Sequence, residues 1–151
     1  MKKILLATIF LSSFSSFAQC IKCNSLEKAL VNPKIVKSLE INAIAHKISF
    51  DSFPTKIFLL VNLEELFLSD MSLNEIPAEI GQLKKLKSIG FVHCNLTGIP
   101  DEIFGLKQLK RVNLATNRFS LENLKDWKIK FRKNIPNADV FISKQYYDIT
   151  L

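Results

Sequence analysis

The middle of the chain repeats one pattern of apolar residues every 23 positions. Leu63, Leu86 and Leu109 open three successive copies, and each is followed by apolar residues three, five and ten positions later. These columns hold Leu66, Ile89 and Val112, then Leu68, Phe91 and Leu114, then Leu73, Leu96 and Phe119. Self-similarity at a fixed spacing of this length indicates a protein built from stacked repeats.

Alternation at the start of each copy predicts a β-strand. Successive side chains of a strand point to opposite faces, so Leu66 and Leu68 face a core while Glu65, Phe67 and Ser69 face outward. One copy cannot bury its own apolar side, and neighbouring copies therefore stack with their strands in a parallel sheet. The predicted continuous core comprises Leu66, Leu68, Ile89, Phe91, Val112 and Leu114.

Together these columns give the pattern L-x-x-L-x-L-x-x-N/C-x-L, met by Leu86, Ile89, Phe91, Cys94 and Leu96. The chain resembles the leucine-rich-repeat family over residues 63 to 120. The resemblance implies an α/β solenoid with a curved parallel sheet on its concave face and short helices or turns on its convex face. In the column of Met71, Cys94 and Asn117, only the asparagine is suited to satisfying backbone groups where the chain turns inward after the strand.

A single domain is expected over 19–151, with repeats over 36–119 and caps over 19–35 and 120–151, because terminal coils would otherwise expose their core. Asn24, with Glu27 three residues later, predicts the start of a helix in the N-terminal cap. Ser120 predicts the start of a helix in the C-terminal cap, followed by a last strand at Val140, Phe141 and Ile142. The role of the tail 143–151 stays open.

The first copy, over 36–62, allows two registers. One uses Val36, Leu39 and Ile41 and requires four extra residues between Asn42 and Asp51. The other keeps the 23-residue spacing but places Glu40 in the first apolar column. The first register is favoured for that reason.

Residues 1–18 have the features of a signal peptide: Lys2 and Lys3, an apolar stretch that opens with Ile4–Phe10, and small residues at Ser16 and Ala18. Serines interrupt the stretch, so it is shorter than a membrane-spanning helix. Gln19 before Cys20 disfavours a lipoprotein, which would need a small residue there. We expect cleavage before Gln19, no transmembrane segment in the mature chain, and a secreted, periplasmic or cell-surface location.

Loss of Lys2 and Lys3 lowers the formal net charge from +7 to +5. The remaining basic residues are mixed with acidic ones along the chain, which is typical of a solvated face and does not favour nucleic acid as a partner. The stretch concerned contains Lys84, Lys85, Lys87, Lys107 and Lys110 among Glu79, Asp101 and Glu102.

Cys20 and Cys23 form a C-x-x-C motif before the first predicted helix. A local disulfide is one interpretation, and a thiol-disulfide oxidoreductase is the alternative. The oxidoreductase motif normally follows a strand, and none is predicted here. No second cysteine pair or nearby histidine completes a zinc site, so no metal is expected. Cys94 falls in a repeat column and is predicted to be a buried small residue.

Stacking places Asp70, His93 and Thr116 in one outward column, which resembles a hydrolase triad. The column lies on an open sheet without a predicted oxyanion hole, and no Gly-rich phosphate loop occurs, so neither an enzyme nor a cofactor is expected. The predicted ligand-binding residues of the concave face are Glu65, Phe67, Ser69, Asp70, Ser88, Val92, His93, Arg111, Asn113 and Thr116.

Phe67 is unusual among these residues, because an outward aromatic exposes apolar area unless something covers it. Two readings stay open: Phe67 anchors a partner, or it packs over Gly90 and Ile44. The function that the resemblance implies is an exported protein-binding scaffold, of undetermined partner and oligomeric state. The alternatives are the thiol-disulfide oxidoreductase and a binder of glycans or envelope polymers.

Overall fold

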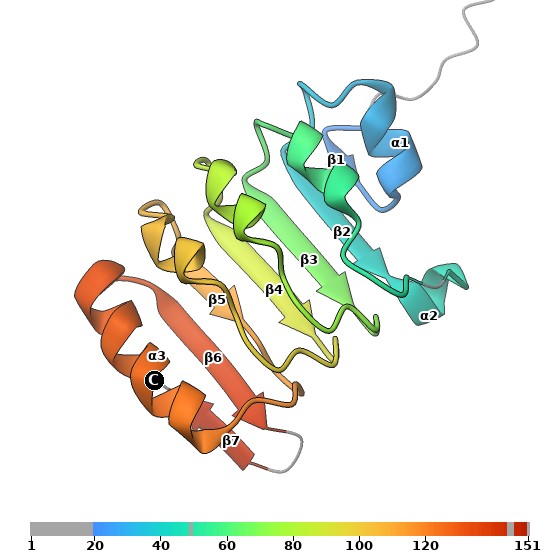
Figure 1. Ribbon diagram of the computed structural model, residues 1–151. Helices are drawn as coiled ribbons and strands as arrows, with labels where there is room; N and C mark the ends of the chain where they lie inside the picture. The colour runs from blue at the N-terminus through green and yellow to red at the C-terminus, as the bar shows by residue number, and fades with distance from the viewer. Residues whose placement is uncertain (1–19, 49, 145–146, 151) are drawn as a thin grey trace, which may run out of the picture.

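A computed structural model describes residues 20–48, 50–144 and 147–150. The predicted signal peptide lies outside these residues. One sheet contains seven strands in chain order: β1 (Lys22–Cys23), β2 (Ser38–Asn42), β3 (Glu65–Ser69), β4 (Ser88–Val92), β5 (Arg111–Asn113), β6 (Asp139–Lys144) and β7 (Tyr147–Thr150). Strands β1 to β6 are parallel, and β7 pairs with β6 in the antiparallel direction (Figure 1).

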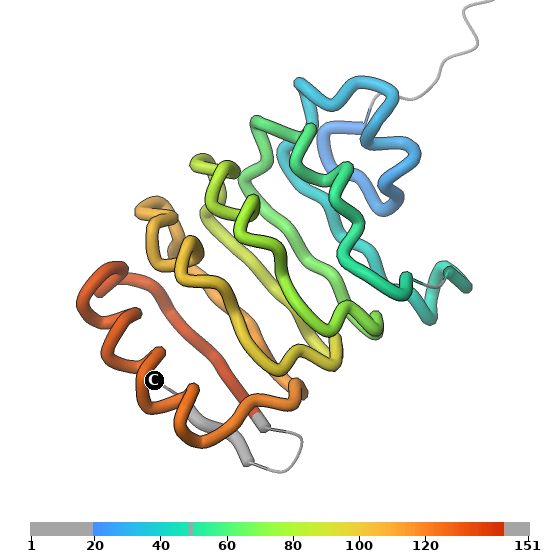
Figure 2. Tube along the Cα trace, in the orientation of Figure 1, coloured from blue at the N-terminus to red at the C-terminus, as the bar shows by residue number. Residues whose placement is uncertain are grey.

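The segments that return from one strand to the next cover one face of the sheet (Figure 1). Three are short 3₁₀ helices, η1 (Thr55–Leu59), η2 (Ala78–Gln82) and η3 (Asp101–Gly105), and the last is the long helix α3 (Leu121–Asn134). The inward strand residues and the apolar sides of these helices form one buried cluster, which includes all six predicted core residues. Figure 2 shows the resulting stack of similar coils.

The strand register agrees with the repeat columns. Leu66 pairs with Ile89, and Ile89 pairs with Val112, each 23 residues further on. In the first copy Leu39 pairs with Leu66, which confirms the favoured register and excludes the alternative. The extra residues of this copy form a short helix, α2 (Ala43–His46), that projects beyond the ends of the strands (Figure 2).

Asn117 joins two coils through its buried side-chain amide. Its Oδ1 atom accepts hydrogen bonds from the backbone N–H groups of Cys94 and Leu96, at 3.0 and 3.1 Å. Its Nδ2 atom donates to the carbonyl oxygens of Phe91, Leu114 and Ala115. The backbone groups freed by the turn are thus satisfied, as the sequence predicts for this position.

The two ends of the sheet differ from the prediction in detail. Helix α1 (Leu26–Val31) is capped by Ser25 and not by Asn24, because the Ser25 hydroxyl is the group that accepts from the N–H of Lys28. The N-terminal segment also supplies the two-residue strand β1, which was not predicted. Ser120 caps α3 as expected. The strand predicted at residues 140–142 is β6, but it is not the last: part of the unplaced tail forms β7.

Among the described residues, no helix combines the length and apolarity needed to cross a bilayer.

Candidate binding surface on the open face of the sheet

The face of the sheet opposite the helices, here called the open face, carries the outward strand residues and corresponds to the predicted concave surface. Parallel pairing arranges these residues in rows that cross the strands. The first row is Ser38, Glu65, Ser88, Arg111 and Asp139. The second row is Glu40, Phe67, Gly90, Asn113 and Phe141. Ser69 and Val92 pair beside Asn42 in a third row and are half-buried.

In the first row Arg111 lies across its neighbours. Its Nε atom donates to the Ser88 hydroxyl at 3.0 Å, and its Nη2 atom is 3.7 Å from a carboxylate oxygen of Glu65. Ser88 is 1% exposed, so the prediction of an outward contact residue is wrong for this position. The cause is the long arginine side chain, which covers the small serine. Arg111 itself remains exposed.

In the second row Phe67 covers Gly90. A Cβ atom on Gly90 would lie 2.3 Å from Cδ1 of the Phe67 ring, a distance that real side chains do not reach. Glycine therefore permits the ring to lie against the neighbouring strand. Ile44 is the second residue over which Phe67 was predicted to pack. Its side chain is 71% exposed, so Phe67 does not cover it. Phe67 is half-buried, so one part of the ring packs on Gly90 and the rest stays accessible.

Two residues that the sequence did not assign to this surface, Asp139 and Phe141, complete it from β6. A hollow in the open face is lined by Glu65, Phe67, Ile89, Arg111, Val112, Asn113, Asp139 and Phe141. Phe67 and Phe141 belong to the same row, separated by Gly90 and Asn113. Because the Phe67 ring lies over Gly90, Asn113 is the position left open between the two aromatic side chains.

Not every charged side chain around this hollow has an ion-pair partner among the described residues. Asp139 pairs in register with Arg111, yet the Arg111 guanidinium is directed to Glu65. Asp139 is exposed and forms no ion pair within the part of the chain that the structure describes. Its carboxylate is thus available to a positively charged group of a ligand.

A second hollow continues the surface toward the N-terminal end. It is lined by Lys22, Cys23, Asn24, Ser38, Glu40, Asn42, Ala45, His46 and Glu65. Glu65 borders both hollows, so they form adjoining parts of one surface. None of the residues contributed here by β1, β2 and α2 was predicted, because the sequence pattern is regular only from Leu63 onward.

The Asp70, His93 and Thr116 column lies just after the strands and not on them. All three residues have positive φ, between 55° and 59°, and each backbone N–H donates to the following coil. Asp70 accepts from Asn42 at 2.8 Å and lies 2.8 Å from Nδ1 of His93. No hydrogen bond joins His93 to Thr116 among the described residues, so the three side chains do not form a connected triad.

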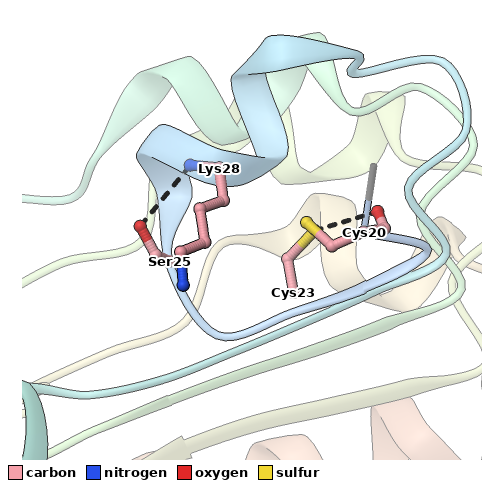
Figure 3. Close-up of a disulfide and its surroundings, with 4 residues drawn as sticks. All are labelled: Cys20, Cys23, Ser25 and Lys28. Carbon is pink, nitrogen blue, oxygen red and sulfur yellow. Dashed lines mark hydrogen bonds between the residues drawn. A yellow bond between two sulfur atoms is a disulfide. The ribbon is translucent and has the colours of Figure 1, made fainter. Parts of the chain in front are cut away.

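The Cys20 and Cys23 sulfur atoms are bonded to each other (Figure 3). The Cys23 sulfur also lies 3.0 Å from the Cys20 carbonyl oxygen, a contact without a proton to share. Cys23 is 4% exposed and belongs to the core. Cys94 is a free buried thiol, and burial raises its pKa to about 11. No group of three or more potential metal ligands occurs among the described residues.

Comparison with known proteins agrees with this architecture. No protein-family model matches the chain, and no curated protein matches it. A solved structure of the LRR protein LIC12759 from Leptospira interrogans is 30% identical and aligns over 79% of the chain with a TM-score of 0.59. The chain spans 28% of that protein's length. The fold is accordingly that of a leucine-rich-repeat-like α/β protein.

Proposed function

We propose that residues 19–151 form one solenoid domain that binds a protein partner on the open face, with the N- and C-terminal elements acting as caps. The observation that carries this proposal is the hollow between Phe67 and Phe141, where the two aromatic side chains lie on either side of Asn113. Aromatic and arginine side chains in partly enclosed positions are frequent anchors of protein interfaces. The likeness to an LRR protein supports the same role.

The hollow favours a particular kind of contact. Parallel strands are ~4.8 Å apart, so three strand steps place Phe67 and Phe141 ~14 Å apart along the row. That span accommodates an extended peptide segment or the side of a helix, with one apolar side chain between the two aromatic rings. A lysine or arginine of the partner would face Asp139, whose carboxylate lacks an ion pair among the described residues.

Substitutions in the hollow are expected to weaken partner binding. Phe67→Ala and Asp139→Asn should each reduce the affinity by roughly fivefold or more, because a few central residues carry most of an interface's binding energy. The partner is first captured by the mature wild-type protein from envelope and medium fractions, and dissociation constants are then measured by calorimetry.

Matched controls lie on the opposite face. Phe58→Ala removes a half-buried aromatic residue of η1, and Asp101→Asn removes an exposed carboxylate of η3. Both should leave the affinity unchanged within about twofold. Loss of binding in the controls, with normal binding by Phe67→Ala and Asp139→Asn, would assign the partner to the helix-covered face.

We further propose that the protein is exported and that cleavage occurs before Gln19, to a secreted, periplasmic or cell-surface location. Support comes from the pattern of residues 1–18 and from the Cys20–Cys23 disulfide, since disulfides persist in oxidising compartments. The mature protein purified from its native source should have an intact mass that begins at Gln19. A mass that begins at Met1, or that includes a lipid on Cys20, would contradict this processing.

A redox function is less well supported than a binding function. Catalysis of thiol exchange requires an accessible attacking sulfur, and of the two sulfur atoms Cys23, which lies nearer the start of α1, is buried against the core while Cys20 is half-buried. The disulfide instead closes the loop that leads into α1 (Figure 3). Its position is that of a structural bond at the end of the sheet.

A further inference from the structure

Lysine side chains gather along one edge of the protein. The loops that lead into β2, β3, β4 and β5 cover residues 32–37, 60–64, 83–87 and 106–110, and they lie in a row at the same ends of the strands (Figure 2). We call them the lysine edge. They contain seven lysines, Lys34, Lys37, Lys84, Lys85, Lys87, Lys107 and Lys110, and the single carboxylate Glu64. Their formal charge is +6, compared with +7 for the whole sequence.

The repeat spacing produces this concentration of charge. Lysines that are 23 residues apart in sequence, such as Lys87 and Lys110, occupy equivalent positions on neighbouring coils, ~4.8 Å apart at the backbone. The nearby acidic residues Glu79, Asp101 and Glu102 lie in η2 and η3, outside these loops. The structure thus separates charges that are mixed along the sequence.

Most of the lysine edge is not neutralised within the described chain. The Glu64 carboxylate forms ion pairs with the ammonium groups of Lys87, at 2.5 Å, and Lys37, at 2.9 Å. These hydrogen bonds lower the pKa of the Glu64 carboxyl to about 2. The ammonium groups of Lys34, Lys84 and Lys110 have no hydrogen-bond or ion-pair partner among the described residues.

The two remaining lysines of the edge bind neutral oxygens and keep their charge unpaired. Lys85 donates to the Asn62 amide oxygen at 2.6 Å, and Lys107 donates to the carbonyl oxygens of Phe104 and Asn134. Neither forms an ion pair within the described part of the chain. Five lysines of the lysine edge therefore lack a carboxylate partner among the described residues.

We propose that the lysine edge binds a linear acidic polysaccharide, with sulfate or carboxylate groups of successive sugars pairing with successive lysines. A row of cations that follows the stacking direction of the coils matches a polymer with regularly repeated anionic groups. All of these cations are lysines, whose flexible stems and single ammonium groups adapt to variable anion spacing, whereas arginine favours fixed bidentate geometry.

The same loops lack the features that other polyanions need. They contain no aromatic residue, so unpaired nucleic acid bases would find no stacking platform. They contain no helix or β-ribbon that could enter the groove of a duplex. Among their described large apolar side chains only Val61 is exposed, which is too little to insert into an anionic membrane surface.

The test compares two triple variants of the full mature chain that change the net charge equally. The edge variant reverses the charge of the three lysines without a partner among the described residues, by Lys34→Glu, Lys84→Glu and Lys110→Glu. The control variant reverses the charge of exposed lysines of α1, η1 and α3, by Lys28→Glu, Lys56→Glu and Lys125→Glu. Heparin is the probe, and unsulfated dextran is the uncharged control. Wild-type binding to heparin should weaken steeply with added salt, and the edge variant should lose about tenfold or more in affinity at low salt.

The control variant should lose clearly less than the edge variant, and Phe67→Ala should bind heparin as the wild type does. Single Lys84→Glu and Lys110→Glu variants, expected to show partial losses, replace the edge triple if it fails to fold. The proposal is overturned if heparin is bound no better than dextran, or if both triples lose affinity equally. Tighter binding to single-stranded DNA or to vesicles of anionic phospholipid than to heparin would also overturn it.

Discussion

Replacing Asn117 with leucine is expected to lower the free energy of unfolding by ~3–5 kcal/mol, because it leaves buried backbone groups without partners. Asn117 is 1% exposed, and its side chain makes five hydrogen bonds. Two are accepted from backbone N–H groups of the preceding coil, so the residue holds adjacent coils together as well as its own turn. Leucine has the same number of side-chain heavy atoms and the same branching as asparagine, so no cavity is left and the loss reports the missing hydrogen bonds.

Chemical denaturation of the mature protein measures this effect through the transition midpoint. Gln108→Leu removes an exposed amide side chain in a loop and should change the stability by less than ~0.5 kcal/mol. Similar midpoints for Asn117→Leu and Gln108→Leu would mean that the turn finds other partners for its backbone groups. A changed slope of the transition would instead indicate a change in the surface exposed on unfolding.

Phe91→Ala is expected to cost ~3–5 kcal/mol, the usual loss on truncating a fully buried aromatic residue. The Phe91 ring is 0% exposed and lies 6.2 Å from the Phe53 ring, which stacks on Phe58 at 5.4 Å. The side chain thus connects the inner face of β4 with the segment around η1. Its removal opens a cavity between the sheet and the helices that cover it.

The melting temperature of Phe91→Ala should fall well below that of the wild type, while the exposed Ser72→Ala should melt within a degree or two of it. Ser88 is unsuitable as a neutral control, because its buried hydroxyl accepts from Arg111. If Phe91→Ala and Ser72→Ala had the same melting temperature, the prediction that the column of Leu68, Phe91 and Leu114 faces the core would be wrong.

The sequence alone determined the coil architecture. Burial in a repeat protein depends on residues at fixed spacings within one coil, and those spacings are visible as columns such as Leu66, Ile89 and Val112. The same columns predicted the strand register, the inward position of Phe91 and the turn made by Asn117. The capping serine of α3 was also predictable, because an N-cap depends only on its immediate neighbours.

Only the tertiary structure decided which outward residues form the candidate site. Asp139 and Phe141 pair with Arg111 and Asn113 28 residues earlier, because α3 is longer than the 3₁₀ helices it replaces and breaks the 23-residue spacing. Burial of Ser88 depends on the path of the Arg111 side chain, which a pattern does not contain.

The lysine edge has the same origin. A sequence shows which charges are adjacent along the chain, whereas the charge of a surface on stacked coils depends on residues that are one repeat apart. Lys37, Lys87 and Lys110 are dispersed in the chain and occupy equivalent positions on the stacked coils only because the strands pair in register. The repeat length was evident in the sequence, but the direction of each side chain and the partners it meets are set by packing between coils.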